Sequence, residues 1–419
     1  MIERVELFRG REIFIFLAVL CAIFIVSISI YYYRYIQFSS IKPNILTCKV
    51  QNQYKKSKHL HEYYILKLKS KNGIVFYTSK GVYIGKIIGD NITVKVILNH
   101  LTFIEYLSGF YAKTKIINIK ANNSFKEKLN YLIAAQHQNQ NIATIYEAMF
   151  TAHAQSKVLR RRFSALGISH LLAISGFHLG VLSAVLFFII GLLYKPLHNR
   201  FFSYRHVNRD IFIMVAACLF WYVWFLGFTP SLIRSFFMLV IGYILYDRGI
   251  KVVSMQTLFV TVALLVAFYP VLLLSLGFWL SVAGVFYIFL FLQYFKFLKK
   301  IYIFLLLPLF VYLMMLPYSI YFFHIFSIYN PLSVVWTELF TIFYPVSIVA
   351  HLFGFGGIFD NLLLKLLALG GHFQTISISG YIFYLHVALS LLAVRFRVFF
   401  YCLNLFALLF FIYCIKYVT

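Results

Sequence analysis

The stretch that decides the fold is Gly167 to Leu182, which reads GISHLLAISGFHLGVL. It joins a lysine-rich N-terminal part of the chain to a long series of apolar segments. His170, Ser175 and His178 stand in it among Leu, Ile and Phe, and Gly176 follows Ser175. Ionisable and polar side chains are costly in hydrocarbon and normally face a protein interior or a water-filled path. The stretch therefore predicts a membrane-spanning segment whose polar side chains face a protein interior or a water-filled path.

The composition of the 419-residue chain is typical of a polytopic membrane protein. It is 62% hydrophobic and 12% charged, whereas soluble domains are nearer half apolar and a quarter charged. Lys and Arg number 38 against 12 Asp and Glu, which gives a formal charge of +26. A coding bias toward Lys, Ile, Phe, Tyr and Asn explains part of this charge but not the scarcity of acids. The balance favours a polyanionic partner or anionic lipid.

The five cysteines indicate neither a zinc site nor a disulfide within the polar N-terminal part. Only Cys48 lies in that part, and the other four lie in apolar segments. No CxxC pair or Cys/His cluster is present, so a structural zinc site is not expected.

Residues 1–35 predict an N-terminal transmembrane anchor. The apolar run Ile13–Tyr33 follows Arg4, Arg9 and Arg11 and is long enough to span a bilayer. It ends in three tyrosines and Arg34, which is typical of an interfacial belt and not of a small-residue cleavage site. We expect the N-terminus to lie on the cytoplasmic side.

Residues 43–120 predict a small OB-like β-barrel. Short segments rich in β-branched and aromatic residues alternate there with Lys, Asn and Gly, and Lys71-Asn72-Gly73 is a hairpin signal. The five expected strands are Ile45–Val50, Tyr63–Lys69, Gly73–Thr78, Asn91–Leu98 and Lys115–Lys120. OB-folds often bind single-stranded nucleic acid.

Lysines interleaved with tyrosines in this region offer either phosphate contacts and stacking faces or simply a solvated surface. The candidate DNA-binding residues here are Lys55, Lys56, Lys58, Lys67 and Lys69.

Residues 124–163 predict one or two amphipathic helices lying along the membrane, interrupted by the polar run Gln136–Asn141. Arg160, Arg161 and Arg162 end this region. Three adjacent arginines can hold phosphates bidentately, or they can anchor the helix at lipid headgroups, which is the commoner use.

The rest of the chain predicts a bundle of membrane spans, about ten with the anchor, in a region 167–352 followed by a C-terminal region 353–419. The expected spans are Leu171–Leu193, Ile211–Phe228, Leu232–Tyr246, Met255–Tyr269, Phe278–Phe295, Ile301–Phe322, Leu332–Leu352, Ile378–Val394 and Val398–Ile415. Gly356–Gly371 is more typical of an interfacial helix, and its placement decides on which side the C-terminus lies.

Loop charges predict the orientation of the bundle. Basic residues collect in alternate loops, for example Arg205 with Arg209 and Lys299 with Lys300, whereas the opposite loops carry none. Because basic loops stay in the cytoplasm, we expect the OB-like domain to be extracytoplasmic.

Side chains that would support catalysis are missing around the opening stretch. His170, Ile174 and His178 are expected on one helical stripe, where the two histidines are too far apart to share a metal alone. Ser175 has no nearby carboxylate and no G-x-S-x-G context, so a hydrolase is disfavoured. The chain also has no P-loop sequence. We expect no enzymatic activity, no cofactor and no metal.

Arg234 is the one cation placed well inside an expected span. It either lines an aqueous path or extends to the outer interface. Glu338 is a lone acid in a later span that could pair with it or bond to a neighbouring helix.

Several of these stretches, taken in order, resemble the ComEC/Rec2 family of DNA internalisation proteins. Gly167–Gly180 resembles the family's HLLAISGLH signature, and Thr229–Met238 (TPSLIRSFFM) resembles a TPSxxRAxxM segment with Ser235 in place of Ala. Tyr269–Gly284 resembles a GFQLS-containing segment, and Asn330-Pro331 resembles another landmark.

The resemblance implies an inner-membrane channel that passes one strand of incoming double-stranded DNA into the cytoplasm. It implies membrane lipids, a periplasmic DNA receptor and cytoplasmic single-strand-binding or motor proteins as partners. Relatives with a metallo-β-lactamase-like domain carry an HxHxDH motif that is not found here, so a channel without nuclease activity is expected. The expected polar path comprises His170, Ser175, Gly176, His178, Arg234, Asn330 and Glu338. The alternative is a secondary transporter or flippase for another anionic solute, although neither internal repeats nor charged coupling residues are seen.

Overall fold

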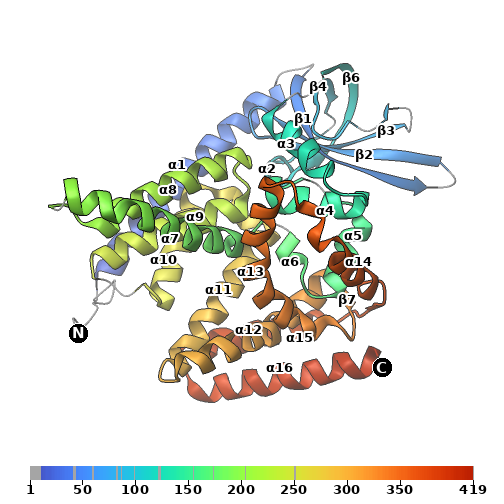
Figure 1. Ribbon diagram of the computed structural model, residues 1–419. Helices are drawn as coiled ribbons and strands as arrows, with labels where there is room; N and C mark the ends of the chain where they lie inside the picture. Colours follow the sequence, from blue (N-terminus) through green and yellow to red (C-terminus); the bar gives the residue numbers. More distant parts are fainter. Residues whose placement is uncertain are drawn as a thin grey trace. The chain divides into compact units, whose positions relative to one another are not determined.

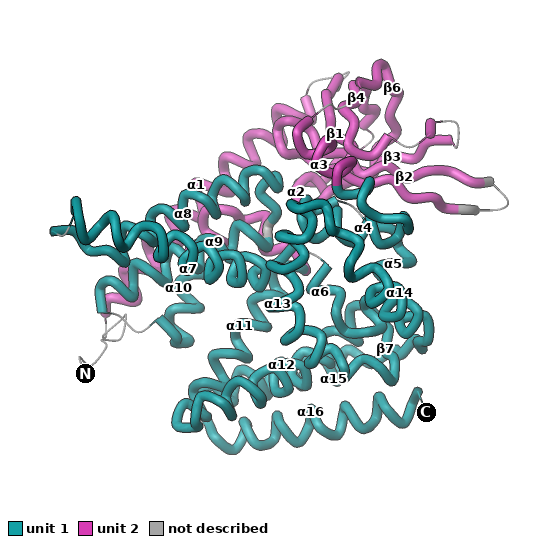
Figure 2. The backbone as a smooth tube through the Cα atoms, in the orientation of Figure 1, with its two compact units in different colours: residues 1–7, 133–262, 277–419 teal, residues 8–132, 263–276 magenta. Residues whose placement is uncertain are grey.

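The computed structural model describes residues 11–40, 44–58, 61–81, 84–85, 87–98, 100–120, 124–153, 155–172, 174–202, 204–249 and 252–418. It divides into two compact units, coloured separately in Figure 2. Unit 2 holds Phe8–Leu132 with Ala263–Leu276, and unit 1 holds Ile133–Val262 with Gly277–Thr419. Arg4 and Arg9, which precede the predicted anchor, lie outside the described residues.

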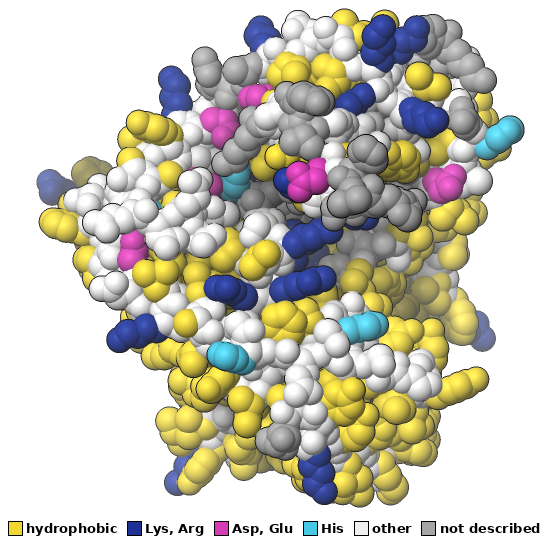
Figure 3. All heavy atoms as spheres, turned by 90° about the vertical axis from the view of Figure 1, so that its right-hand side faces the viewer, with side chains coloured by type: hydrophobic (Ala, Val, Ile, Leu, Met, Phe, Trp, Pro, Cys, Tyr) yellow, Lys and Arg dark blue, Asp and Glu magenta, His cyan; other side chains and the backbone are white. Residues whose placement is uncertain are grey.

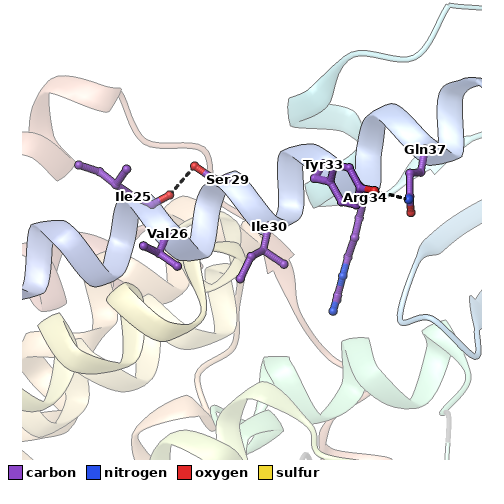
Figure 4. A pocket seen from close by; sticks show the side chains of 7 residues that line it. All are labelled: Ile25, Val26, Ser29, Ile30, Tyr33, Arg34 and Gln37. Carbon is purple, nitrogen blue, oxygen red and sulfur yellow. Dashed lines mark hydrogen bonds between the residues drawn. The ribbon is translucent and has the colours of Figure 1, made fainter.

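Unit 2 begins with the long apolar helix α1 (Glu12–Ser40). Only 6% of its most apolar 18-residue window is buried inside the structure, which is what a helix facing lipid requires. A shallow groove along α1 is lined by residues of this one helix, including Ile25, Ile30 and Arg34 (Figure 4). The groove is therefore a feature of one helix surface and not an enclosed site.

The predicted β-rich domain is a six-stranded sheet within unit 2. Its strands follow the order β5-β3-β2-β1-β4-β6, and β1 pairs antiparallel with both β2 and β4. The strands are β1 (Asn44–Lys58), β2 (His61–Ser70), β3 (Val75–Gly81), β4 (Asn91–Ile97), β5 (Phe110–Tyr111) and β6 (Lys113–Lys120). Over the described residues, the hydrogen-bonded strand order is open, so the OB-type barrel stays a prediction.

The sheet forms because inward positions alternate along its strands. Leu66 and Leu68 on β2, Phe76 on β3 and Ile92 and Val94 on β4 are all fully buried and belong to one core. The β2–β3 connection is the predicted hairpin turn, with Gly73 at φ +83°. A left-handed conformation of this kind suits glycine, which has no Cβ. The helix α2 (Phe103–Ser108) and the 3₁₀ turn η2 (Pro270–Leu274) also belong to unit 2.

The predicted amphipathic region contains two helices, α3 (Phe125–Ala134) and α4 (Gln140–Thr151). The side chain of Asn139 accepts a hydrogen bond from the backbone of Asn141 and starts α4, so the polar run between them separates the helices. Two short helices follow, α5 (Lys157–Ala165) and α6 (Ser169–Leu172).

Unit 1 is built from apolar helices, labelled in Figure 1. Counting α1, seven helices among the described residues are long and apolar enough to cross a membrane. The other six lie at α7 (Gly176–Phe201), α8 (Val207–Phe225), α11 (Leu276–Phe295), α12 (Lys300–Phe323), α13 (Ser333–Leu352, with the 3₁₀ turn η3, Asn330–Leu332, before it) and α16 (Arg397–Val418). The remaining predicted spans are also helical, at α9 (Pro230–Asp247), α10 (Met255–Phe268) and α15 (Gly380–Ala393). The chain is thus mostly helical and multi-pass in character.

The helices of unit 1 form two groups. Helices α7, α8 and α9 pack together around a core that includes Val215, Leu219 and Leu232. Helices α11, α12, α15 and α16 surround a second core that includes Tyr287 and Leu403. Helix α13 contacts both α7 and α12, so it joins the two groups.

The predicted interfacial segment near the C-terminus is a 3₁₀ turn, η4 (Gly356–Phe359), followed by the short helix α14 (Asp360–Leu369). A small two-stranded ladder joins β7 (Ile325–Phe326) to β8 (Gln374–Thr375). The sides of the membrane on which these elements lie stay a prediction.

Candidate functional site

The opening stretch of the sequence is broken into two helices. Helix α6 ends at Leu172 and α7 begins at Gly176, so the predicted single stripe of His170, Ile174 and His178 is wrong. The cause is a capping box, in which Ser175 Oγ accepts from the backbone N–H of Phe177 at 3.2 Å. In return, the Ser175 backbone N–H donates to His178 Nδ1 at 3.3 Å. This exchange satisfies backbone donors that would otherwise be left unpaired at the helix start.

His178 is held by this cap in one tautomer. Because Nδ1 accepts a hydrogen bond, the ring proton of the neutral imidazole lies on Nε2. The residue is fully buried, and its ring packs edge-on against Phe340 and Tyr344 at centroid distances of 5.0 Å and 4.8 Å. Nε2 has no hydrogen-bond partner among the described residues. His178 is therefore a buried polar group inside the helix group.

Gly176 allows helix α9 to approach the start of α7. A methyl group at Gly176 would lie 2.4 Å from Ser235 Oγ, closer than any carbon side chain tolerates. Ser231 Oγ on the same helix donates to the carbonyl of Ile174 at 3.1 Å. Gly176 thus permits close packing of α9 against the start of α7.

Arg234 lies beside this contact and is only 2% exposed. Its Nη2 donates to Ser235 Oγ at 3.1 Å, whereas Nε and Nη1 have no partner among the described residues. The ion pairs of the described residues do not include one between Arg234 and Glu338, so their predicted pairing is wrong. Burial also disfavours the alternative in which Arg234 extends to the interface.

A buried guanidinium without a counter-charge is costly. Here it stands next to the N-terminus of a 26-residue helix, because the methyl position on Gly176 is 3.6 Å from Arg234 Nη2. A helix N-terminus carries partial positive charge and favours anions. Two positive features therefore converge, and within the described ranges of the chain no acid forms an ion pair with Arg234. This arrangement suits a phosphate or other oxyanion.

His170 and Glu338 are more exposed than Arg234. His170 is exposed, and its Nε2 lies 3.4 Å from Thr337 Oγ1 on α13. Glu338 is partly exposed on the same helix. The structure therefore brings His170 near the residue that precedes Glu338 but gives no ion pair at this position.

Asn330 fastens the chain instead of lining a path. Its Nδ2 donates to the carbonyl of Ala165 at 3.0 Å, and its Oδ1 accepts from the Tyr312 hydroxyl at 3.0 Å. Only 2% of Asn330 is exposed. Since both ends of the amide are engaged, it ties the end of α5 to α12 and η3.

The lysines proposed for DNA contact have different surroundings. Lys67 and Lys69 point away from the core of the sheet, and Lys67 Nζ lies 6.0 Å from the centre of the Tyr77 ring. Lys55 is paired with Glu62 at 2.5 Å. Lys56 is exposed, and the side chain of Lys58 lies outside the described part of the structure.

The arginines of α5 also differ among themselves. Arg160 and Arg161 are exposed, whereas the backbone carbonyl of Arg162 would lie only 2.6 Å from a methyl group on Gly370. Figure 3 shows one face of the molecule, on which Lys and Arg side chains are more numerous than acidic ones.

Sequence reasoning missed the serines and tyrosines that complete this site. Ser231 and Ser235 are four residues apart, and this spacing indicates that both lie on one face of the helix that carries Arg234. The hydroxyl contact of Tyr222 with Tyr344, at 3.2 Å, joins residues 122 positions apart and left no local signal. Among the described residues, no group of three or more His, Cys, Asp or Glu side chains could hold a metal ion.

Comparison with protein families gives one match. The family model described as Competence protein matches residues 152–418, which is more than half of the chain and includes Ser175, His178, Arg234 and Asn330. Searches of curated proteins and of solved structures gave no match.

Proposed function

This chain belongs to the Competence protein family, and from that membership we propose that it passes a single DNA strand through the inner membrane during natural transformation. The family supports a role in DNA uptake. The narrower role as a channel is proposed from the charges of the matched region.

The observation that carries the proposal is the buried cation at Arg234, which forms no ion pair with any acid that the structure describes. A transported DNA strand is a chain of phosphates, and a buried guanidinium beside a helix N-terminus lowers the barrier to an anion. His178, two residues after Gly176 on α7, adds a second buried polar group, and its ring packs against Phe340 and Tyr344 of α13. A transporter for cations would place acids at this position instead.

We also propose that the sheet of unit 2 is OB-like and contacts DNA outside the membrane. Its two outermost strands, β5 and β6, are separated in sequence only by Ala112, and β5 pairs parallel with β3. The Ala112 N–H donates to the carbonyl of Tyr77 at 2.9 Å. The two edge strands of the sheet are thus joined by a single residue, which supports closure of the sheet into a barrel. The position of Lys67 against Tyr77 supports a surface for base stacking and phosphate contact.

The proposed channel has no catalytic role and takes its driving force from elsewhere. A periplasmic DNA receptor and cytoplasmic single-strand-binding or motor proteins would supply and withdraw the strand. The metal-free and cofactor-free character of this role rests on the scarcity of acids and the lack of a P-loop sequence.

The test compares Arg234→Gln with Arg248→Gln. Both residues belong to the α9 region, but Arg248 is exposed at its far end and serves as the matched control. Losing a hydrogen bond to a charged group costs about 1.5–3 kcal/mol, so internalisation should slow by about 10- to 100-fold. Fluorescent DNA should then accumulate outside the inner membrane, with the membrane content of the protein unchanged by immunoblot. Equal internalisation by the two variants, or normal transformation in a clean deletion, would refute the proposal.

A further inference from the structure

A second polar cluster lies in unit 1, formed by three residues far apart in sequence. His137 lies between α3 and α4, His351 near the end of α13, and Asp360 at the start of α14. The His137 side chain is fully buried and that of Asp360 is 17% exposed. None of these residues belongs to the site around Arg234.

The hydrogen bonds fix where the ring protons lie. His351 Nδ1 lies 2.7 Å from the carbonyl oxygen of Ser347, which only accepts, so this nitrogen carries a hydrogen. His137 Nδ1 lies 2.9 Å and 3.1 Å from the two carboxylate oxygens of Asp360, so it also donates. A neutral imidazole has one donor and one acceptor nitrogen, and in each ring the donor is therefore already assigned to Nδ1.

The two Nε2 atoms then face each other at 3.0 Å. If both rings were neutral, two lone pairs would meet at hydrogen-bond distance, which is repulsive. One additional proton between them turns the contact into a hydrogen bond and gives the pair a positive charge opposite Asp360. Assigning that proton to Asp360 instead leaves the number of bound protons the same.

We propose that His137, His351 and Asp360 form a site for one proton that fastens α14 to α13. When the proton is bound, the cluster is neutral overall and every inward nitrogen is paired. When it leaves, the histidines repel and the carboxylate of Asp360 is left mostly buried without a counter-charge, which is costly. Rising pH therefore releases α14 and the loop that holds His137.

The surroundings isolate this proton from other charges. The Tyr146 ring stacks on His137 at 4.6 Å and lies 4.5 Å from the His351 ring. Burial, followed by the charge of Asp360, raises the pKa of Tyr146, so its phenol stays neutral. Phe150 also covers His351, edge-on at 5.0 Å.

The helices next to the cluster, α4, α14 and α5, carry other charged side chains. On α4, Glu147 lies 3.8 Å from His153, and on α14, Lys365 is exposed. On α5, which contacts α14, the charged residues are Lys157, Arg160, Arg161 and Arg162.

Local packing shows that the three segments meet tightly here. Gln136 Nε2 donates to the carbonyl of His351 at 3.1 Å, and Gln136 Oε1 accepts from the Gly356 N–H at 2.9 Å. A methyl group at Gly356 would lie 2.8 Å from His351 Nε2. The proton therefore sits at the junction of α13, η4 and the loop that holds His137.

The test measures hydrogen exchange of the segment 356–371 in the full chain in lipid nanodiscs, from about pH 6 to about pH 8, which brackets the ordinary histidine range. After correction for the pH dependence of intrinsic exchange, the equilibrium constant for opening of this segment should increase by up to about tenfold per pH unit if opening releases one proton. The wild type should show this slope. The control His170→Gln changes an exposed histidine outside the cluster and should retain it.

The decisive variant is His351→Gln. A glutamine amide has both a donor and an acceptor, so it can satisfy His137 in either protonation state, and the pH slope should disappear while α14 stays protected. A second variant, Asp360→Asn, keeps an acceptor for His137 but removes the negative charge, so release should begin at lower pH. An equal slope in wild type and His351→Gln would overturn the proposal. Protection regained at high pH on adding Zn²⁺ would also overturn it, in favour of a metal site.

Discussion

Replacing Gly176 by alanine tests the packing on which the Arg234 site depends. The new methyl group would lie 2.4 Å from Ser235 Oγ and 3.2 Å from Ser235 Cβ. The hydroxyl cannot turn away without loss, because it donates to the Ser231 carbonyl at 2.8 Å and accepts from Arg234 Nη2 at 3.1 Å. The variant must therefore either strain the helix contact or give up both hydrogen bonds.

The size of the effect follows from those two bonds. A neutral hydrogen bond contributes about 1 kcal/mol and one to a charged group about 1.5–3 kcal/mol. Gly176→Ala should thus lower the free energy of unfolding by about 2.5–4 kcal/mol. Gly180→Ala is the matched control, since a methyl group there meets nothing within 4 Å and alanine favours helix by about 0.5–1 kcal/mol.

The assay is denaturant unfolding of the full chain in detergent micelles, followed by the loss of helical circular dichroism. Adding Ser235→Ala to Gly176→Ala removes the clashing oxygen, so the double variant should be more stable than the sum of the single changes predicts. The reasoning is refuted if Gly176→Ala is as stable as Gly180→Ala, or if the two substitutions are simply additive.

Other parts of the chain give further expectations. Burial lowers the pKa of Lys126 to about 8, below its ordinary 10.5; the folded state then binds fewer protons, so stability should rise from about pH 8 to 10.5. The difference in unfolding free energy between wild type and Lys126→Met should show this rise, and a flat difference would contradict it. Replacing Lys67 and Lys69 by Gln should reduce the slope of log binding constant against log salt concentration for single-stranded DNA by about 1.4, at about 0.7 per phosphate contact. The control Lys55→Gln removes a lysine paired with Glu62 and should change this slope less. Equal slopes in all variants would exclude these contacts. Asn330→Ala leaves buried partners unpaired and should cost about 2–4 kcal/mol of stability, measured by the same unfolding assay; a loss below about 1 kcal/mol would mean that the fastening role is wrong.

Local patterns in the sequence predicted much of the architecture. Alternation in the β-rich region and the turn at Gly73 gave the strands, because a side-chain period of two and a glycine turn are local properties. The start of α7 was misplaced because a capping box usually has Glu or Gln at its third helical position, and here His178 takes that place.

The chemistry of the candidate sites was less accessible from sequence. Arg234 was recognised as a cation inside an expected span, but whether it is buried and which side chains surround it depend on how the helices pack. The contact between His137 and His351 joins positions 214 residues apart, and neither histidine lies in a recognisable motif. Such pairs are set by helix packing, which a single sequence does not encode in any local period.

The long strand β1 has a consequence for the behaviour of the chain at high concentration. It pairs with β4 only over Asn44–Lys49, so the backbone beyond that point has a strand neighbour on one side alone, over the described residues. An unpaired strand edge attracts strands of other molecules, and lysines on the edge discourage such joining. Lys55 and Lys56 occupy this edge, and replacing both with valine should produce self-association into strand-paired oligomers. The charge on this strand edge would thereby keep separate copies of the chain apart.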